Sequence, residues 1–518
     1  MPSADTRPLL FQRVLNGLVS LGKRFRVPLL SALLFGFLAH TFAFTNKLVN
    51  HDEVQCLFSK GATVVSGRWG LGALDSLFPN VSMPWIYGVI TMLLLAVSVC
   101  VLVSTLSIGS RWMQVLAAGL VLTFPSLTGT FGYLFTASSY GAAFLLAVLG
   151  PWLLQRKSPL YWLGALACMV LSLSIYQAYV SLAAALLVLV LIRQLLEGED
   201  AAAVLRRGIG YVLFLILALG IYFGLTQLIL TLKHLQMASY ASNSVTFDLR
   251  SLPGTIALAY RNFFLNFQEP AFGLIPTVFS RRVHLLLMLC AAALLVLRTV
   301  RMRPNALSLP LLAALIAALP LAVNCMYLFT APESIHTLVL YGFVAVYLLV
   351  LVLADGALEL PAVKKWAEFG RRAALNGTVF LCAAILVVNI YVANSAYLTL
   401  HLRYENAYAF YTALIADIRQ SPEFTQGTKL AVLGTWEDPD FYGENLDFTN
   451  YLTGVTGFKP DSYSKERFLR YYLGISVPFA TEEEQAEIAA SPEYAQMPAY
   501  PYYGSMCKIG DVMVVKLS

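Results

Sequence analysis

Long apolar stretches recur along this chain as far as about residue 400, and each is near the roughly 20 residues that a helix needs to cross a bilayer. Of the 518 residues, 58% are hydrophobic and only 12% are charged. Soluble domains carry about 25% charged residues, so this composition excludes an ordinary soluble protein. The sequence predicts a polytopic α-helical membrane protein with about eleven transmembrane helices.

Basic residues fall mostly in the short segments between these stretches, which is the pattern that marks cytoplasmic loops. The net charge of +6 therefore reports membrane topology, and no nucleic-acid partner is expected. The basic segment 1–27 is predicted to lie in the cytoplasm, and residues 28–400 are predicted to form the transmembrane domain. The expected spans are near Pro28–Phe44, Met83–Leu106, Trp112–Phe124, Ser138–Leu154, Leu160–Ser174, Ala178–Ile192, Gly208–Leu232, His284–Leu297, Leu309–Phe329, Thr337–Leu353 and Val379–Leu400.

An odd number of spans places the C-terminus outside the cytoplasm. Residues 401–518 are charged and rich in tyrosine, and they predict a small extracytoplasmic α/β domain. Its expected elements are a helix at Tyr404–Ile418, strands at Lys429–Leu433 and Val512–Leu517, and a helix that starts at Thr481. Two external loops stand out, 45–82 and the long segment 233–282. The segment Pro125–Thr130 is expected to be only a short turn between the spans Trp112–Phe124 and Ser138–Leu154.

The first external loop carries the sequence Asn50-His51-Asp52-Glu53 directly after the first span. Ionisable groups near hydrocarbon are costly and tend to be functional. A carboxylate there can take a proton from a hydroxyl nucleophile, and partial burial raises its pKa toward a usable range. Asp52 and Glu53 are therefore candidate general bases and His51 a candidate binding residue. The alternative is that both acids are solvated or pair with Lys47 and Arg68.

Cationic residues at the external side form the second set of candidates. Arg68, in Gly67-Arg68-Trp69-Gly70, offers a planar fork of donors suited to phosphate, and flanking glycines allow close approach of the backbone to a ligand. Its alternative role is an interfacial arginine that reaches toward headgroups. Arg261, Arg281, Arg282 and Lys233 depart from the cytoplasmic pattern, and they are candidates for binding phosphate or anionic lipid. Further candidates are the pair Glu333 and His336, and the sugar-facing or membrane-interface side chains Tyr133, Tyr176, Gln177 and Trp85.

The chain has no Walker loop, no dinucleotide glycine motif and no zinc signature. Its seven cysteines are scattered, and whether Cys56 and Cys507 pair is left open. An outward-facing site without a nucleotide motif favours a donor that is already in the membrane.

These motifs resemble those of the bacterial serotype-converting glucosyltransferases (glucosyl transferase type II domain) in the polyprenol-dependent GT-C superfamily. The resemblance rests on Asn50-His51-Asp52-Glu53, on Ser66-Gly67-Arg68-Trp69-Gly70 and on Ser82-Met83-Pro84-Trp85, together with the hydropathy of about residues 25–400. Many members of the superfamily carry two aspartates in this loop, whereas this chain has Asp52-Glu53, so the identity of the base stays open.

The resemblance implies a GT-C-like fold in the bacterial cytoplasmic membrane and transfer of a sugar, with glucose expected, from a polyprenyl-phosphate donor to a surface glycan such as O-antigen. It implies inversion at the anomeric carbon, Asp52 or Glu53 as base, and Arg68 or the group Arg261, Arg281 and Arg282 at the leaving phosphate. Some superfamily members use a divalent cation, and no ligand set here selects one. The main alternative is a transporter or flippase of lipid-linked sugars, although internal repeats and mid-membrane charges typical of transporters are lacking.

Overall fold

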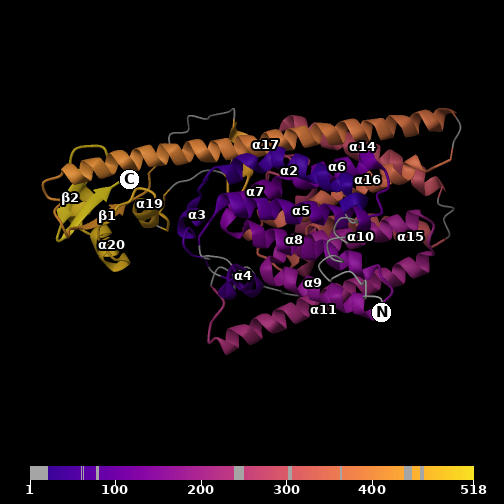
Figure 1. Cartoon of the computed structure of the whole chain (residues 1–518), viewed down its shortest axis with the longest axis horizontal. Helices are drawn as coiled ribbons and strands as arrows, with labels where there is room; N and C mark the ends of the chain where they lie inside the picture. Colours follow the sequence, from indigo (N-terminus) through magenta and orange to yellow (C-terminus); the bar gives the residue numbers. More distant parts are fainter. Residues whose placement is uncertain are drawn as a thin grey trace, which may run out of the picture.

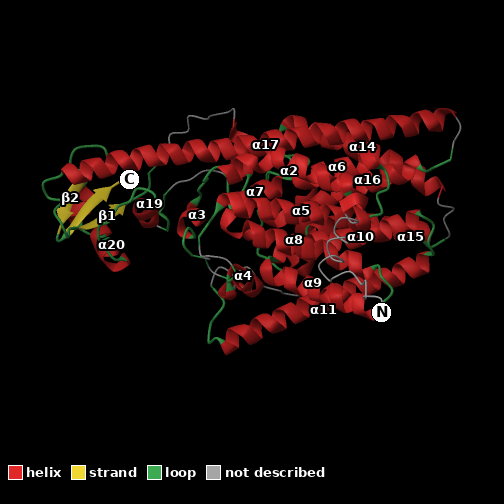
Figure 2. Cartoon of the chain, viewed as in Figure 1, coloured by secondary structure: helices red, strands yellow, loops and turns green. Residues whose placement is uncertain are grey.

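The computed structural model describes residues 22–59, 61, 63–77, 81–238, 250–301, 306–361, 365–436, 446–455, 460–461 and 463–518. Most of the predicted cytoplasmic N-terminus, and part of the predicted external loop 233–282, therefore lie outside the described residues. The described chain forms an elongated helical bundle, with the few β-strands at one end (Figures 1 and 2).

Within the described residues, eight helices are long and apolar enough to cross a membrane, or nine if one bent pair counts as a single span. Two further apolar helices, α9 (Pro159–Ile175) and α15 (Ser308–Val323), are shorter. The full-length spans contain α2 (Arg26–Thr45), α5 (Pro84–Thr105), α8 (Leu134–Leu154), α10 (Val180–Leu196), α11 (Ala201–Leu232), α14 (Val278–Arg301), α16 (Val344–Leu358) and α17 (Lys365–Gln420). The protein is thus a polytopic helical membrane protein, but the full-length helices do not reach the predicted number of about eleven.

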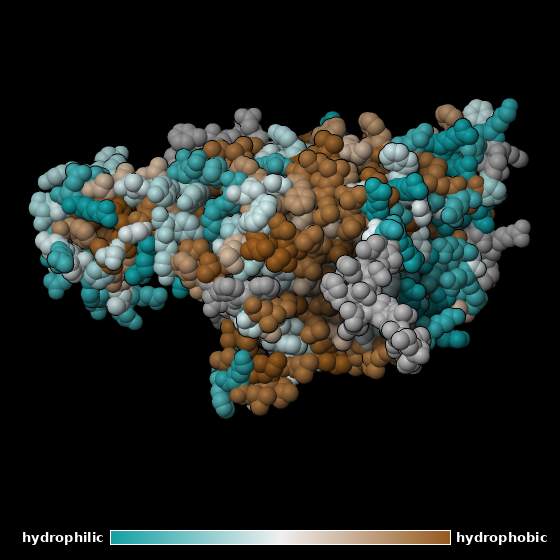
Figure 3. Space-filling model, in the orientation of Figure 1, coloured by the Kyte–Doolittle hydropathy of each residue, from teal (hydrophilic) through white to brown (hydrophobic). Residues whose placement is uncertain are grey.

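The outer surface of the bundle agrees with this assignment. A brown, apolar region covers the middle of the helical part, and hydrophilic teal residues gather toward both ends (Figure 3). Exposed apolar side chains are unfavourable in water, and a contiguous band of them marks a surface that contacts lipid.

The bent pair corrects one prediction. The segment Pro125–Thr130, expected to be a connecting turn, belongs to the helix α7 (Pro125–Gly132), which follows α6 (Arg111–Leu122) at an angle of 43°. Proline at the first position of a helix is well tolerated, so Pro125 ends one helix and begins the next. All eight residues of α7 are buried, and Ser126 Oγ donates to the Thr337 carbonyl at 2.6 Å.

Short helices gather near the end of the bundle that faces the β-strands, where Figure 1 shows α3 and α4. The short helices between the spans are α3 (His51–Gln55), η1 (Val64–Ser66), α4 (Trp69–Asp75), η2 (Gln177–Tyr179), α13 (Leu252–Leu265), η3 (Cys325–Leu328), η4 (Pro332–Ser334) and η5 (Thr337–Phe343). The spans thus supply a rigid frame for loops that carry polar side chains.

Helix α17 runs for 56 residues along the whole bundle and on to the β-strands (Figure 1). It joins the predicted span Val379–Leu400 and the predicted helix Tyr404–Ile418 into one continuous element. No glycine or proline occurs between those two segments, so nothing in the local sequence interrupts the helix.

The C-terminal part contains a three-stranded sheet of order β1-β3-β2. Strand β1 (Lys429–Leu433) is parallel to β3 (Val512–Lys516), and β2 (Met506–Ile509) is antiparallel to β3. Both predicted strands are confirmed, and β2 was not predicted. The remaining elements are η6 (Asp447–Tyr451), α19 (Lys465–Tyr471), α20 (Glu482–Ala489), which Thr481 caps, and α21 (Pro492–Gln496). Cys56 and Cys507 are both free.

Candidate active site

Asp52 lies on the first turn of α3 and lines a cavity of about 540 Å³ at the end of the bundle. Its side chain is 36% exposed, and the Nε2 atom of His51 lies 3.8 Å from its Oδ2 atom. Burial is the largest influence on Asp52 and raises its pKa above the ordinary value; His51 and Arg68 oppose the rise, while Glu53 and Asp461 add to it. A half-buried carboxylate with a raised pKa is suited to accept a proton.

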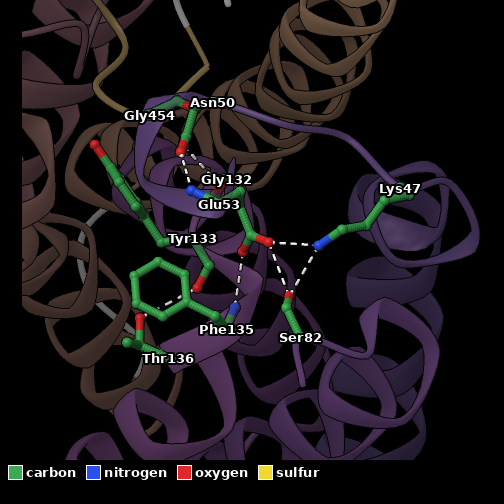
Figure 4. Close-up of polar contacts among 9 residues, drawn as sticks. All are labelled: Lys47, Asn50, Glu53, Ser82, Gly132, Tyr133, Phe135, Thr136 and Gly454. Carbon is green, nitrogen blue, oxygen red and sulfur yellow. Dashed lines mark hydrogen bonds and ion pairs between the residues drawn. The ribbon is translucent and has the colours of Figure 1, made fainter. Parts of the chain in front are cut away.

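Glu53, the next residue, has a different environment (Figure 4). Its side chain is fully buried, and Oε2 accepts hydrogen bonds from Lys47 Nζ at 2.7 Å and from Ser82 Oγ at 2.8 Å. Its Oε1 accepts from the backbone N–H of Phe135 at 2.8 Å, in the first turn of α8, where the helix dipole favours an anion. These four residues form the Glu53 cluster, which ties the first loop to α8.

Asn50 fixes the other side of the same loop. Its side-chain oxygen accepts from the Glu53 N–H at 2.9 Å and caps α3, which is a typical role for asparagine. Its Nδ2 donates to the carbonyls of Gly132 at 2.8 Å and Gly454 at 3.0 Å (Figure 4). Asn50 thereby joins α3, α7 and the C-terminal part of the chain.

The contact between α7 and the C-terminal part depends on glycine. A Cβ atom on Gly132 would lie 2.7 Å from the Gly454 carbonyl oxygen, and one on Gly129 would lie 2.8 Å from that of Thr453. Both distances are shorter than Cβ contacts in real structures, so only glycine permits this approach. The two glycines sit three residues apart, on one face of α7.

Arg68 lies in the same cavity as Asp52. Its Nη1 donates to the Tyr140 hydroxyl at 3.1 Å, and its guanidinium carbon lies 5.5 Å from the centre of the Tyr176 ring. The next side chain, Trp69, donates from Nε1 to Thr226 on α11 at 3.2 Å, which fixes this loop against the bundle.

The glycines beside Arg68 pack closely against two neighbouring helices. A Cβ atom on Gly67, where φ is +74°, would lie 2.6 Å from the Tyr222 hydroxyl, and one on Gly70 would lie 2.1 Å from Ser174 Oγ. These glycines allow close packing against α11 and α9. They hold the guanidinium at the cavity by fixing the loop that carries it.

A second, mainly apolar cavity of about 380 Å³ adjoins the first. Arg68, Tyr176, His336 and Val339 line both cavities, whereas Asp52 lines only the larger one. The lining of the smaller cavity includes the apolar side chains of Leu173, Val180, Leu219, Phe223, Met326 and Phe329, and also the polar side chains of Ser66, Gln177, Tyr222, Thr330 and Ser334. Arg68 therefore stands where the two cavities meet.

The structure adds several side chains that the sequence did not single out, or offered only as weak candidates. Tyr140 and Tyr463 line the larger cavity with Tyr133 and Tyr176. His336 lines it too. Burial lowers the pKa of His336, and the nearby positive charge of Arg68 lowers it further. Tyr140 and Tyr463 could not be found from sequence because each belongs to a segment without a motif and is brought in by folding.

The other predicted cations lie elsewhere. Arg261 is exposed on α13 and Arg282 is exposed near the start of α14, and neither lines either of the two cavities. Arg281 donates to the carbonyls of Ile275 at 3.4 Å and Pro276 at 3.2 Å and is likewise absent from both linings. Across the part of the chain that the structure describes, no group of three His, Cys, Asp or Glu residues is placed to hold a metal ion.

Comparison with known proteins gives one match. No curated protein and no solved structure matches the chain. The model of the family described as "Glucosyl transferase GtrII" matches residues 41–349, which is more than half of the chain and includes both Asp52 and Arg68. The chain belongs to the glucosyl transferase GtrII family.

Proposed function

We propose that this membrane glycosyltransferase moves glucose from a polyprenyl-phosphate donor to a surface glycan on the extracytoplasmic face of the bacterial cytoplasmic membrane. The observation that carries the proposal is the shared cavity of Asp52 and Arg68, which adjoins an apolar chamber. Such a pair of cavities suits a donor with a lipid tail, a phosphate and a sugar.

In the proposed reaction Asp52 takes the proton of an acceptor hydroxyl. The acceptor oxygen attacks the anomeric carbon from the face opposite the phosphate, the bond to the phosphate oxygen breaks, and the product has inverted configuration. Arg68 stabilises the charge that develops on the leaving phosphate. Positioning of the two substrates contributes most of the remaining acceleration.

The proposal assigns Glu53 a positioning role. Its two oxygens already accept three hydrogen bonds inside the Glu53 cluster, and the side chain has no exposure to the cavity. Arg261, Arg281 and Arg282 are proposed to bind anionic lipid headgroups or the acceptor's charges outside the cavity.

The proposed topology follows the charge pattern. Counting the bent pair and the two shorter apolar helices as spans gives the eleven of a GT-C-like arrangement. The N-terminus would then be cytoplasmic, and residues 401–518 would form an extracytoplasmic α/β domain on the side where the candidate site lies.

The experiment is sugar transfer by the purified protein from radiolabelled polyprenyl-phosphate glucose to membranes that carry the native surface glycan. Asp52→Asn keeps the shape of the side chain and removes the base, so transfer should fall about 10²–10⁴-fold while the protein stays folded. Normal transfer by Asp52→Asn would remove Asp52 from the mechanism. Absence of transfer by wild type, with movement of the lipid-linked sugar across vesicles, would establish a flippase instead.

A further inference from the structure

One wall of the Asp52 cavity comes from the C-terminal part of the chain, through Tyr463. The Tyr463 side chain is 52% exposed, and its ring centre lies 6.4 Å from that of His51, with the rings nearly perpendicular. His51 is itself exposed and lies beside Asp52. Two exposed rings thus stand next to the proposed base, on elements more than 400 residues apart in sequence.

The two cavities differ in whether Tyr463 lines them. Arg68 lines both the smaller cavity and the Asp52 cavity, whereas Tyr463 lines only the latter. In an inverting transfer the base and the leaving phosphate act on opposite faces of the sugar. If the phosphate is at Arg68, the acceptor hydroxyl must approach Asp52 from another side of the cavity. Tyr463 lines this cavity, and its ring contacts His51, the neighbour of Asp52.

We propose that Tyr463, with His51 beside it, forms the acceptor subsite and binds a hexose unit of the surface glycan. A pyranose ring has an apolar face of C–H groups that packs on an aromatic ring, while the tyrosine hydroxyl and the imidazole hydrogen-bond to its hydroxyls. This inference rests on the proposed function and names the surface that selects the acceptor.

The segment that carries Tyr463 is held against the first loop. Gln55 donates from Nε2 to the Tyr463 carbonyl, and Arg467 donates to the Gln55 carbonyl. Helix α19 in turn packs on α17, where the Phe468 ring lies 5.8 Å from that of Tyr411. The hydrogen bond from Gln55 and the packing of α19 therefore hold the backbone of Tyr463 in place at the cavity, which is the preorganisation that a binding residue needs.

The kinetic test compares three variants of the full-length protein in the transfer assay. Tyr463→Ala should raise the apparent KM for acceptor-bearing membranes at least tenfold, with a smaller change in kcat, and should lower the ratio of sugar transfer to donor hydrolysis by a similar factor. Tyr463→Phe, which keeps the ring, should recover most of this loss. Tyr503→Ala is the matched control, because Tyr503 is fully exposed on the C-terminal part and lines neither cavity.

A second measurement does not depend on catalysis. Replacing the side chain of residue 463 by p-benzoylphenylalanine and irradiating with acceptor-bearing membranes should attach glycan to the protein, whereas the same replacement at 503 should not. Glycan capture at 463 by a protein that transfers no sugar would refute the proposed function and keep the subsite. Transfer by wild type together with normal kinetics for Tyr463→Ala, or with no capture at 463, would refute the subsite and keep the function.

Discussion

Two neighbouring carboxylates of the first loop meet opposite environments. The carboxylate of Glu53 is buried and accepts hydrogen bonds from Lys47, Ser82 and the Phe135 N–H. Asp52, in contrast, is half-exposed in a cavity that Arg68 also lines. The difference arises from the helical geometry of α3, which turns successive side chains about 100° apart. Glu53 therefore holds the loop in place, and its neighbour Asp52 stays accessible from the cavity.

The largest effect is expected at Arg68, which tests whether the residues that line the Asp52 cavity are needed for activity. Arg68→Gln should lower kcat about 10²–10³-fold, because a charged donor to the leaving phosphate is lost. The matched variants Arg261→Gln and Arg282→Gln should change kcat by much less, since neither side chain lines the cavities. Equal losses in all three would show that the arginines act together through long-range charge, and the distinction between cavity and surface would fail.

The cluster side is tested at Glu53. Glu53→Ala should destabilise the protein by about 3 kcal/mol, because it leaves Lys47, Ser82 and the Phe135 N–H without their acceptor. Thermal unfolding in detergent measures this effect, and Asp52→Asn provides the control in the neighbouring residue. Wild-type stability in Glu53→Ala, with activity lost, would instead make Glu53 the catalytic residue.

The glycine contact beneath the cluster predicts a smaller change in stability. Gly132→Ala should cost about 1–3 kcal/mol, since the new methyl group collides with the Gly454 carbonyl. Gly210→Ala on α11 is the control, because nothing lies within 4 Å of its Cβ position and alanine is the better helix former. Equal effects of the two changes would show that the α7 contact tolerates movement.

The smallest expected effect is a shift in pH dependence. The raised pKa of Asp52 means that activity should decline, as pH falls, at a higher pH than for an ordinary aspartate. The same shift favours the protonated form in the fold, so the stability associated with it is present at low pH and lost as pH rises through the raised pKa. Asp52→Asn should therefore unfold at the same or a higher temperature than wild type at pH 7, and a clearly lower temperature would contradict this.

The sequence could predict the parts of the fold that depend on local pattern. Most predicted span boundaries lie within a few residues of the helix ends, because the length of an apolar stretch can be read directly from the sequence. The helix α7 was missed because Pro125 and its small polar neighbours are typical of a turn as well as of a buried helix start. The continuity of α17 cannot be predicted from this pattern, because a change in polarity near residue 400 is also typical of a boundary between a span and a separate domain.

The candidate site was predictable only in part. Loop position and residue type were enough to select Asp52, Glu53 and Arg68, but burial of Glu53 depends on Lys47 and on the start of α8, far along the chain. Tyr140 and Tyr463 reach the cavity through tertiary packing alone. No local pattern distinguishes them from the chain's other tyrosines.

The unbroken length of α17 determines how far this helix extends beyond the membrane. At about 1.5 Å per residue the helix spans on the order of 80 Å, against a hydrocarbon core of about 30 Å, so a long section stands clear of the membrane. It ends beside the sheet, and α19 packs against it. Under the proposed function, the number of residues in that section would set the distance between the lipid surface and the glycan-binding surface. That distance would decide which sugar of a growing polymer is modified. Seven added residues, close to two turns, would move the glycan-binding surface about 10 Å farther from the lipid and leave its orientation nearly unchanged. A single added residue would rotate it by about 100° about the helix axis.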